Sequence, residues 1–306
     1  MNDGPTLTTF FANWSIFRDA VFTGALAGAL LGFLGVQIVL RRMVFASSAI
    51  AQAAALGVAL SFWVPAIVDP AGHAARHASD PAAHIVPLYY EPVLWALAAS
   101  LLATLAFVAN PVRLHLTRES VLGVVFLLGG AGTVIVGDRI KQESNDLSAI
   151  LFGSAVVVQR TDLILIAIAT AVLLTIHALR MRALVFAAYD PVGARVQGLP
   201  VAKLNTFVFL AVGIAVALGT RALGALPVFA FSVLPAMAAL TLTSRLPLVF
   251  ALAAGLGALS GGGGYLVSFR GDLPVGATQT AVALGLFALA LARRAFMRGR
   301  AKETTT

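Results

Sequence analysis

The chain has 306 residues, of which 59% are hydrophobic and only 11% are charged, and its mean hydropathy is +0.93. Since an ordinary soluble domain carries roughly 25% charged residues, this composition excludes a soluble globular protein. The net charge of +8 would suit a nucleic-acid partner, but basic residues of membrane proteins gather in cytoplasmic loops. The positions of the charges along the chain therefore decide between a nucleic-acid-binding protein and a membrane protein.

Nine runs of 17 or more residues contain no Asp, Glu, Lys or Arg. Roughly 20 apolar residues in a helix cross the ~30 Å hydrocarbon layer, and a charge at mid-helix costs about 2.5 to 3.5 kcal/mol. The sequence therefore predicts an all-α, polytopic transmembrane bundle of about nine spans, within a range of eight to ten. The runs are 20–40, 43–68, 92–112, 120–137, 163–179, 204–220, 222–244, 246–269 and 273–292.

The basic residues predict how these spans are oriented. With the amino terminus outside and the carboxyl terminus, 293–306, in the cytoplasm, 14 of the 21 Lys and Arg residues lie inside. The uncharged stretch 147–159 has 13 residues, and if it crossed the membrane the inside count would fall to 7. This stretch is therefore predicted to be re-entrant or interfacial. The chain is expected to be one membrane-embedded domain, 1–306, in the lipid bilayer and without a nucleic-acid partner.

The predicted extracytoplasmic loop, residues 69–91, carries three histidines, His73, His77 and His84, together with Asp80. Imidazole and carboxylate groups suit zinc, so these side chains are candidate weak metal ligands if the loop folds so that they converge. The surrounding Ala, Gly and Pro residues are typical of a flexible segment. The alternative is therefore a solvated loop with incidental histidines.

The predicted cytoplasmic segment 184–200 contains a short helix with a cap at each end. Asp190 can accept hydrogen bonds from the free amides of the first turn, Pro191 suits the first helical position, and Gly198 followed by Pro200 ends the helix. Such an element is either a well-ordered loop or a rigid lever between two spans.

Glycine is dense in the eighth predicted span, which contains Gly255, Gly257 and the run 261–264. Four consecutive glycines loosen a helix unless neighbouring helices pack tightly against them. Close helix packing and a functional hinge are the two interpretations.

Five short segments follow one another along most of the chain: Arg41-Arg42-Met43 with Gly57; Asp146-Leu147 with Asp162-Leu163; Asp190, Ala194, Gly198 and Pro200 with Leu204-Asn205; Val233-Leu234-Pro235-Ala236; and Asp272-Leu273-Pro274 with Gly276. In this order they resemble the signatures of the ABC-3 family, the zinc, manganese and iron permeases of ABC transporters.

This resemblance implies a permease subunit that moves divalent metal ions, zinc before manganese or iron, across the cell membrane. It also implies a homodimer, a P-loop ATPase partner and an extracytoplasmic metal-binding protein. Asp190, Pro191, Ala194 and Gly198 would form the coupling helix on which the ATPase docks. No segment matches G-x-x-x-x-G-K-[ST], so the chain itself is expected to be no enzyme and to bind no cofactor, with ATP hydrolysed by the partner.

The second span departs from the family pattern, in which Asp is followed four residues later by His. The corresponding residues here are Ser48 and Gln52, which share a helix face and are candidates for lining the substrate path. Neutral hydroxyl and amide groups ligate a divalent cation weakly. The alternatives are that the two side chains join helices by hydrogen bonds, or that the substrate is different or chelated in a diverged permease.

Two other function classes compete with an ATP-driven permease. An ion-coupled secondary transporter ordinarily needs ionisable residues within the membrane, whereas His177 is the only histidine in a predicted span and no span contains Asp or Glu. An intramembrane enzyme would need a nucleophile and a base at matching depth, and the chain has no cysteine and no paired carboxylates in its spans.

Overall fold

The computed structural model describes residues 7–68, 91–109, 117–140 and 158–303, and every regular element within these ranges is a helix. The elements are α1 (Leu7–Ala12), α2 (Trp14–Leu40), α3 (Val44–Val68), α5 (Pro92–Val108), α6 (Arg118–Arg139), α8 (Arg160–Tyr189), α9 (Pro191–Val196), α10 (Val201–Leu223), α11 (Ala225–Leu242), α12 (Leu246–Ala258), the π-helix η4 (Leu259–Gly263), α13 (Gly264–Gly271) and α14 (Val275–Glu303).

The predicted membrane bundle is confirmed. Within the described ranges, eight helical units are long and apolar enough to cross a bilayer: α2, α3, α6, α8, α10, α11, the continuous unit Leu246–Gly271 and α14. Helix α5 is equally apolar but has only 17 residues. Each of the nine charge-free runs therefore falls on a helix, while most of the stretch 147–159 lies outside the described residues.

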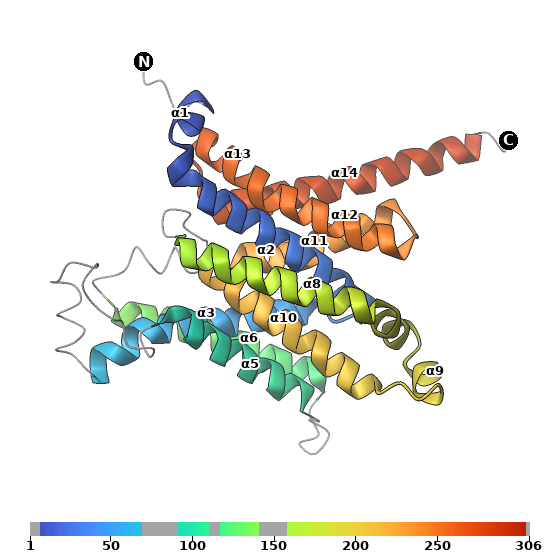
Figure 1. Ribbon diagram of the computed structural model, residues 1–306, viewed down its shortest axis with the longest axis horizontal. Helices are drawn as coiled ribbons and strands as arrows, with labels where there is room; N and C mark the ends of the chain where they lie inside the picture. Colours follow the sequence, from blue (N-terminus) through green and yellow to red (C-terminus); the bar gives the residue numbers. More distant parts are fainter. Residues whose placement is uncertain (1–6, 69–90, 110–116, 141–157, 304–306) are drawn as a thin grey trace.

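Helix α2 lies at the centre of the bundle. It packs against α8, α10, α11 and α12, while α3, α5 and α6 form a group beside α10, and α14 packs on α11 and α13. Figure 1 shows α9 and the carboxyl end of α14 on one side of the bundle, opposite to α1. We call the side that carries α9 the α9 end.

The glycines of α2 and α12 bring these two helices into backbone contact. A Cβ atom on Gly257 would lie 2.0 Å from the carbonyl oxygen of Gly28, and one on Gly28 would lie 2.1 Å from that of Gly257. Gly24 and Gly261 repeat this contact one turn away. In the π-helix, the Gly261 carbonyl accepts a hydrogen bond of 2.8 Å from Nε2 of Gln279 on α14. These glycines therefore pack closely, as the first interpretation expected.

Two glycines on α12 provide a matched test of this packing. Alanine in place of Gly257 should lower the free energy of unfolding by about 1 to 3 kcal/mol, because the backbones must separate. Gly255 has no atom within 4 Å of its Cβ position, so Gly255→Ala should leave stability unchanged or raise it through helix propensity. Thermal unfolding in detergent measures both, and equal melting temperatures for the two variants would contradict the close contact.

Candidate coupling helix and substrate path

The short helix α9 is capped at both ends, as the sequence predicts. The Asp190 carboxylate accepts a hydrogen bond of 2.8 Å from the Gly193 amide, and Pro191 occupies the first helical position. At the other end Gly198 adopts a φ of +79°, which favours glycine. The amides of Gly198 and Leu199 then donate to the carbonyls of Arg195 and Ala194, each at 2.9 Å, in a Schellman motif.

One face of α9 is anchored and the opposite face is free. Ala194 is fully buried in a cluster with Ala187 of α8 and Val201 of α10. On the other face Val192 and Val196 are 68% and 83% exposed. The caps hold α9 in shape and its buried face contacts α8 and α10, so a force applied to its exposed face would reach both long helices.

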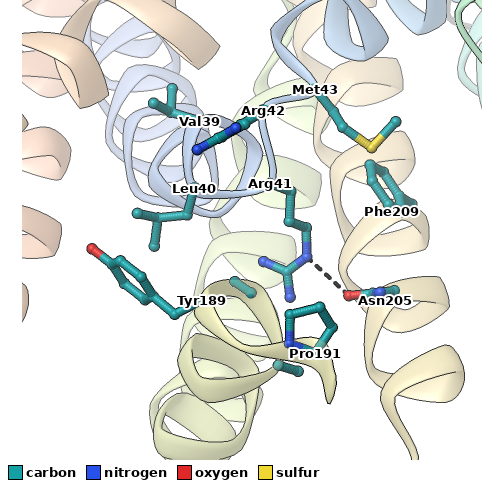
Figure 2. Close-up of a pocket in the computed structure, with 11 residues that line it drawn as sticks. Val39, Leu40, Arg41, Arg42, Met43, Tyr189, Pro191, Asn205 and Phe209 are labelled. Carbon is teal, nitrogen blue, oxygen red and sulfur yellow. Dashed lines mark hydrogen bonds between the residues drawn. The ribbon is translucent and has the colours of Figure 1, made fainter. Parts of the chain in front are cut away.

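Arg41, at the end of α2, joins three long helices beside α9 (Figure 2). Its Nε donates to the Asn205 amide oxygen of α10 at 3.1 Å, and its Nη2 donates to the Leu184 carbonyl of α8 at 3.2 Å. Its Nη1 donates to the carbonyl and the side-chain oxygen of Gln37, one turn back on α2. Burial lowers the pKa of Arg41 to about 10, so the guanidinium stays protonated at neutral pH.

A pocket of about 470 Å³ opens beside this arginine. It lies where the link between α2 and α3 meets the end of α8, the start of α9 and the start of α10 (Figure 2). Its lining residues are Val39, Leu40, Arg41, Arg42, Met43, Ala187, Ala188, Tyr189, Pro191, Asn205 and Phe209. In Figure 2 the Arg41 side chain points toward Asn205 and Pro191, whereas the Arg42 side chain points away from Arg41.

The candidate path residues Ser48 and Gln52 lie one turn apart on α3. Ser48 is buried and Gln52 is partly buried, and the Gln52 side-chain oxygen lies 3.6 Å from the Cβ position of Gly130 on α6. The neighbouring Ser47 has a different environment, since its hydroxyl lies 2.9 Å from the Ser232 hydroxyl of α11. In the described part of the chain, no three His, Asp or Glu side chains gather as metal ligands.

A buried ion pair lies where α8 begins and α10 ends. The Asp162 carboxylate, whose side chain is only 4% exposed, lies 3.5 Å from Nη1 of Arg221 and accepts a hydrogen bond of 3.0 Å from the Gln159 amide. The burial of this carboxylate was not predicted, because the charge-free run starts at residue 163, whereas α8 already starts at Arg160. Asp162 and the Arg41 contacts therefore tie α8 to α10 at both ends.

Comparison with known proteins places this geometry in a family. The model of the ABC 3 transport family matches residues 13–294. The chain belongs to the ABC 3 transport family.

Three known proteins illustrate the likeness within the ABC 3 transport family. Manganese transport system membrane protein MntC of Halalkalibacterium halodurans is 30% identical over 288 residues, which are 93% of this chain and 90% of MntC. High-affinity zinc uptake system membrane protein ZnuB of Haemophilus influenzae is 23% identical over 282 residues, which are 92% of this chain and 98% of ZnuB. The solved structure of PsaBC from Streptococcus pneumoniae in complex with Fab shares the fold, with a TM-score of 0.76 and 20% sequence identity. The match covers 93% of this chain and 95% of the chain in that structure.

The sequence-predicted residues of this ABC 3 chain fall into three groups. Asp190, Pro191, Ala194 and Gly198 come together in and around α9. Ser48 and Gln52 share a face of α3. The loop with His73, His77 and His84 lies outside the described residues. The contacts of Arg41 and Asp162 were not predicted, although both residues belong to segments that resemble family signatures.

The buried pair of Asp162 and Arg221 can be tested by removing one charge or both. Asp162→Asn should lower the free energy of unfolding by about 3 kcal/mol or more, because it leaves the Arg221 cation without its anion. The double variant Asp162→Asn/Arg221→Gln should recover much of this loss. Unfolding in detergent followed by intrinsic fluorescence measures both variants, and a double variant no more stable than the single one would contradict the pairing.

Proposed function

We propose that the chain is the membrane-spanning permease subunit of an ATP-driven importer of divalent metal ions, located in the cell membrane. The observation that carries this proposal is the capped helix α9, which presents an exposed face at one end of the bundle and is anchored to two long helices. Family membership supports it, since the relatives named above are metal transport and uptake proteins. The chain would not hydrolyse ATP itself.

Three partners follow from this proposal. A P-loop ATPase would dock on α9, an extracytoplasmic binding protein would deliver the metal, and a second copy of the chain would complete the permease. Closure of the ATPase would push α9 and move α8 and α10 together, because the Asp162 and Arg41 contacts tie them at both ends. Such a push would come from the α9 end of the bundle, and this agrees with the proposed orientation, in which the α9 end faces the cytoplasm.

Manganese is the first metal to test. Ser48 and Gln52 offer hydroxyl and amide oxygens, and oxygen donors suit manganese better than zinc, which prefers imidazole and thiolate ligands. Manganese transport proteins also occur among the relatives, including manganese import system permease protein ScaB of Streptococcus pneumoniae. Zinc, the first expectation from the sequence, is the alternative, and a chelated metal would suit the neutral path as a third substrate.

The coupling role of α9 can be tested at Gly198. A Cβ at this position meets no atom within 4 Å, so a side chain there points to open space, while the φ of +79° strains any substituted residue to a similar degree. Gly198→Asp should abolish transport and capture of the ATPase while membrane insertion persists, because it adds a negative charge to the docking face. Gly198→Asn, which also tolerates positive φ and has nearly the same size, isolates the effect of charge. Normal capture of the ATPase by the Asp variant would count against the assignment.

The path role of Ser48 and Gln52 can be tested by metal-resolved uptake in cells that lack other importers. Ser48→Ala/Gln52→Met removes both oxygen donors at similar volume and should lower manganese uptake about tenfold or more, equivalent to about 1.4 kcal/mol or more. The ATPase should still copurify with this variant. Ser47→Ala is the matched control, since it loses a bond between helices but no path residue. Wild-type uptake by the double variant would assign Ser48 and Gln52 to helix packing.

A further inference from the structure

Arg41 carries a positive charge for which the described part of the chain supplies no anion. Its hydrogen-bond acceptors are the carbonyl and amide oxygens of Gln37, the Leu184 carbonyl and the Asn205 amide oxygen, and all four are neutral. No carboxylate among the described residues lies within ion-pair distance of its guanidinium. Arg41 is partly buried, and charges withdrawn from water are ordinarily paired, so its guanidinium is available to an anion from outside the described chain.

The pocket beside Arg41 has room for the missing anion. Its volume of about 470 Å³ exceeds what one acidic side chain needs. The backbone around the pocket is held in place by the bonds of Arg41 to α8 and α10. A carboxylate that entered would therefore meet a positioned guanidinium, and such charge-assisted hydrogen bonds are about twice as strong as neutral ones.

The surface next to the pocket indicates the source of the anion. Pro191 and Tyr189 line the pocket, and Tyr189 is 62% exposed. They continue directly into the exposed apolar face of α9, formed by Val192 and Val196. A protein that covered this face would also reach the mouth of the pocket. A lipid headgroup would leave uncovered the apolar face of α9, which lies between the end of α8 and the start of α10.

We propose that the pocket receives an acidic side chain of the ATPase, whose carboxylate pairs with the Arg41 guanidinium when the ATPase docks on α9. The inference rests on the proposed function and adds to it a second, charged anchor beside the helix. The anchor would couple docking to α2 as well as to α8 and α10, because Arg41 belongs to the end of α2.

Asn205→Asp tests the proposal by supplying the anion from within. The new carboxylate would occupy the place of the amide oxygen, now 3.1 Å from Nε of Arg41, and would neutralise the guanidinium. The fold should be retained, while the affinity of the detergent-purified permease for its ATPase should fall about 10- to 100-fold. Asn205→Ala is the comparison variant, since it removes the hydrogen bond that positions Arg41 but leaves the cation, and should weaken ATPase binding clearly less than Asn205→Asp does.

A second pair of variants approaches the pocket from its exposed wall, where the fold tolerates change. Tyr189→Glu should weaken ATPase binding about tenfold more than Tyr189→Gln, because only the acid can compete for the cation. Thermal unfolding establishes that each variant is folded.

The outcomes separate the two proposals. If the wild-type permease captures no ATPase, the proposed function itself fails. If it captures the ATPase but Asn205→Asp binds as the wild type does, or no more weakly than Asn205→Ala, the Arg41 anchor is overturned. A third outcome is that vesicles of anionic phospholipid stabilise the wild type against thermal unfolding but not Asn205→Asp, while both bind the ATPase equally. That result would also overturn the Arg41 anchor and would assign the pocket to a headgroup phosphate.

Discussion

Every backbone amide and carbonyl that crosses the bilayer must find its partner within the protein, and this constraint explains much of the structure. It accounts for the all-helical architecture of the described residues. It also explains how the polar side chains of the spans behave, since many donate to a carbonyl one turn back, as Thr133 does to Gly129 and His177 to Leu173. Where the glycine-rich span widens into the π-helix, Gln279 supplies a bond to the Gly261 carbonyl.

The same constraint concentrates irregular backbone and charge near the ends of the bundle. At one end Asp162 pairs with Arg221, and at the other Arg41 gathers the ends of α2 and α8 and the start of α10. Between these ties, α8 and α10 pack through apolar side chains such as Ile166, Leu173 and Val212. Such an interface offers no specific bonds between the middles of α8 and α10, so the ties at their ends determine whether these two helices move together.

The sequence predicted the features that depend on local rules. Charge-free runs predicted the helices, and the order Asp190, Pro191 and Gly198 predicted a capped helix whose hydrogen bonds close within ten residues. In contrast, the bond between Arg41 and Asn205 joins residues 164 positions apart. Which side chains meet across such a distance depends on how helices rotate and pack, and hydrophobic runs contain no information on rotation.

Asp162 illustrates the same limit at a helix end. Its charge placed it outside the predicted span, yet it sits in the first turn of α8, where its carboxylate accepts the Gln159 amide and so satisfies one of the free groups of the helix start. A rule that treats each charge as a boundary therefore moves the helix start inward by a turn. The burial of Asp162 further depends on Arg221, from a helix about 60 residues away in sequence.

Neutral side chains at Ser48 and Gln52 have a consequence for selectivity if they line the path. Hydroxyl and amide dipoles replace only part of the hydration that a divalent cation loses, so the cation would be held weakly and would keep more of its water. Weak binding favours rapid passage and discriminates poorly between metals. In such a transporter the protein that delivers the metal would set the selectivity, and ATP-driven movement of α9 would set the direction. A chain whose described charges lie near the ends of its bundle suits that division of roles, because no group of three His, Asp or Glu side chains among the described residues would retain the ion.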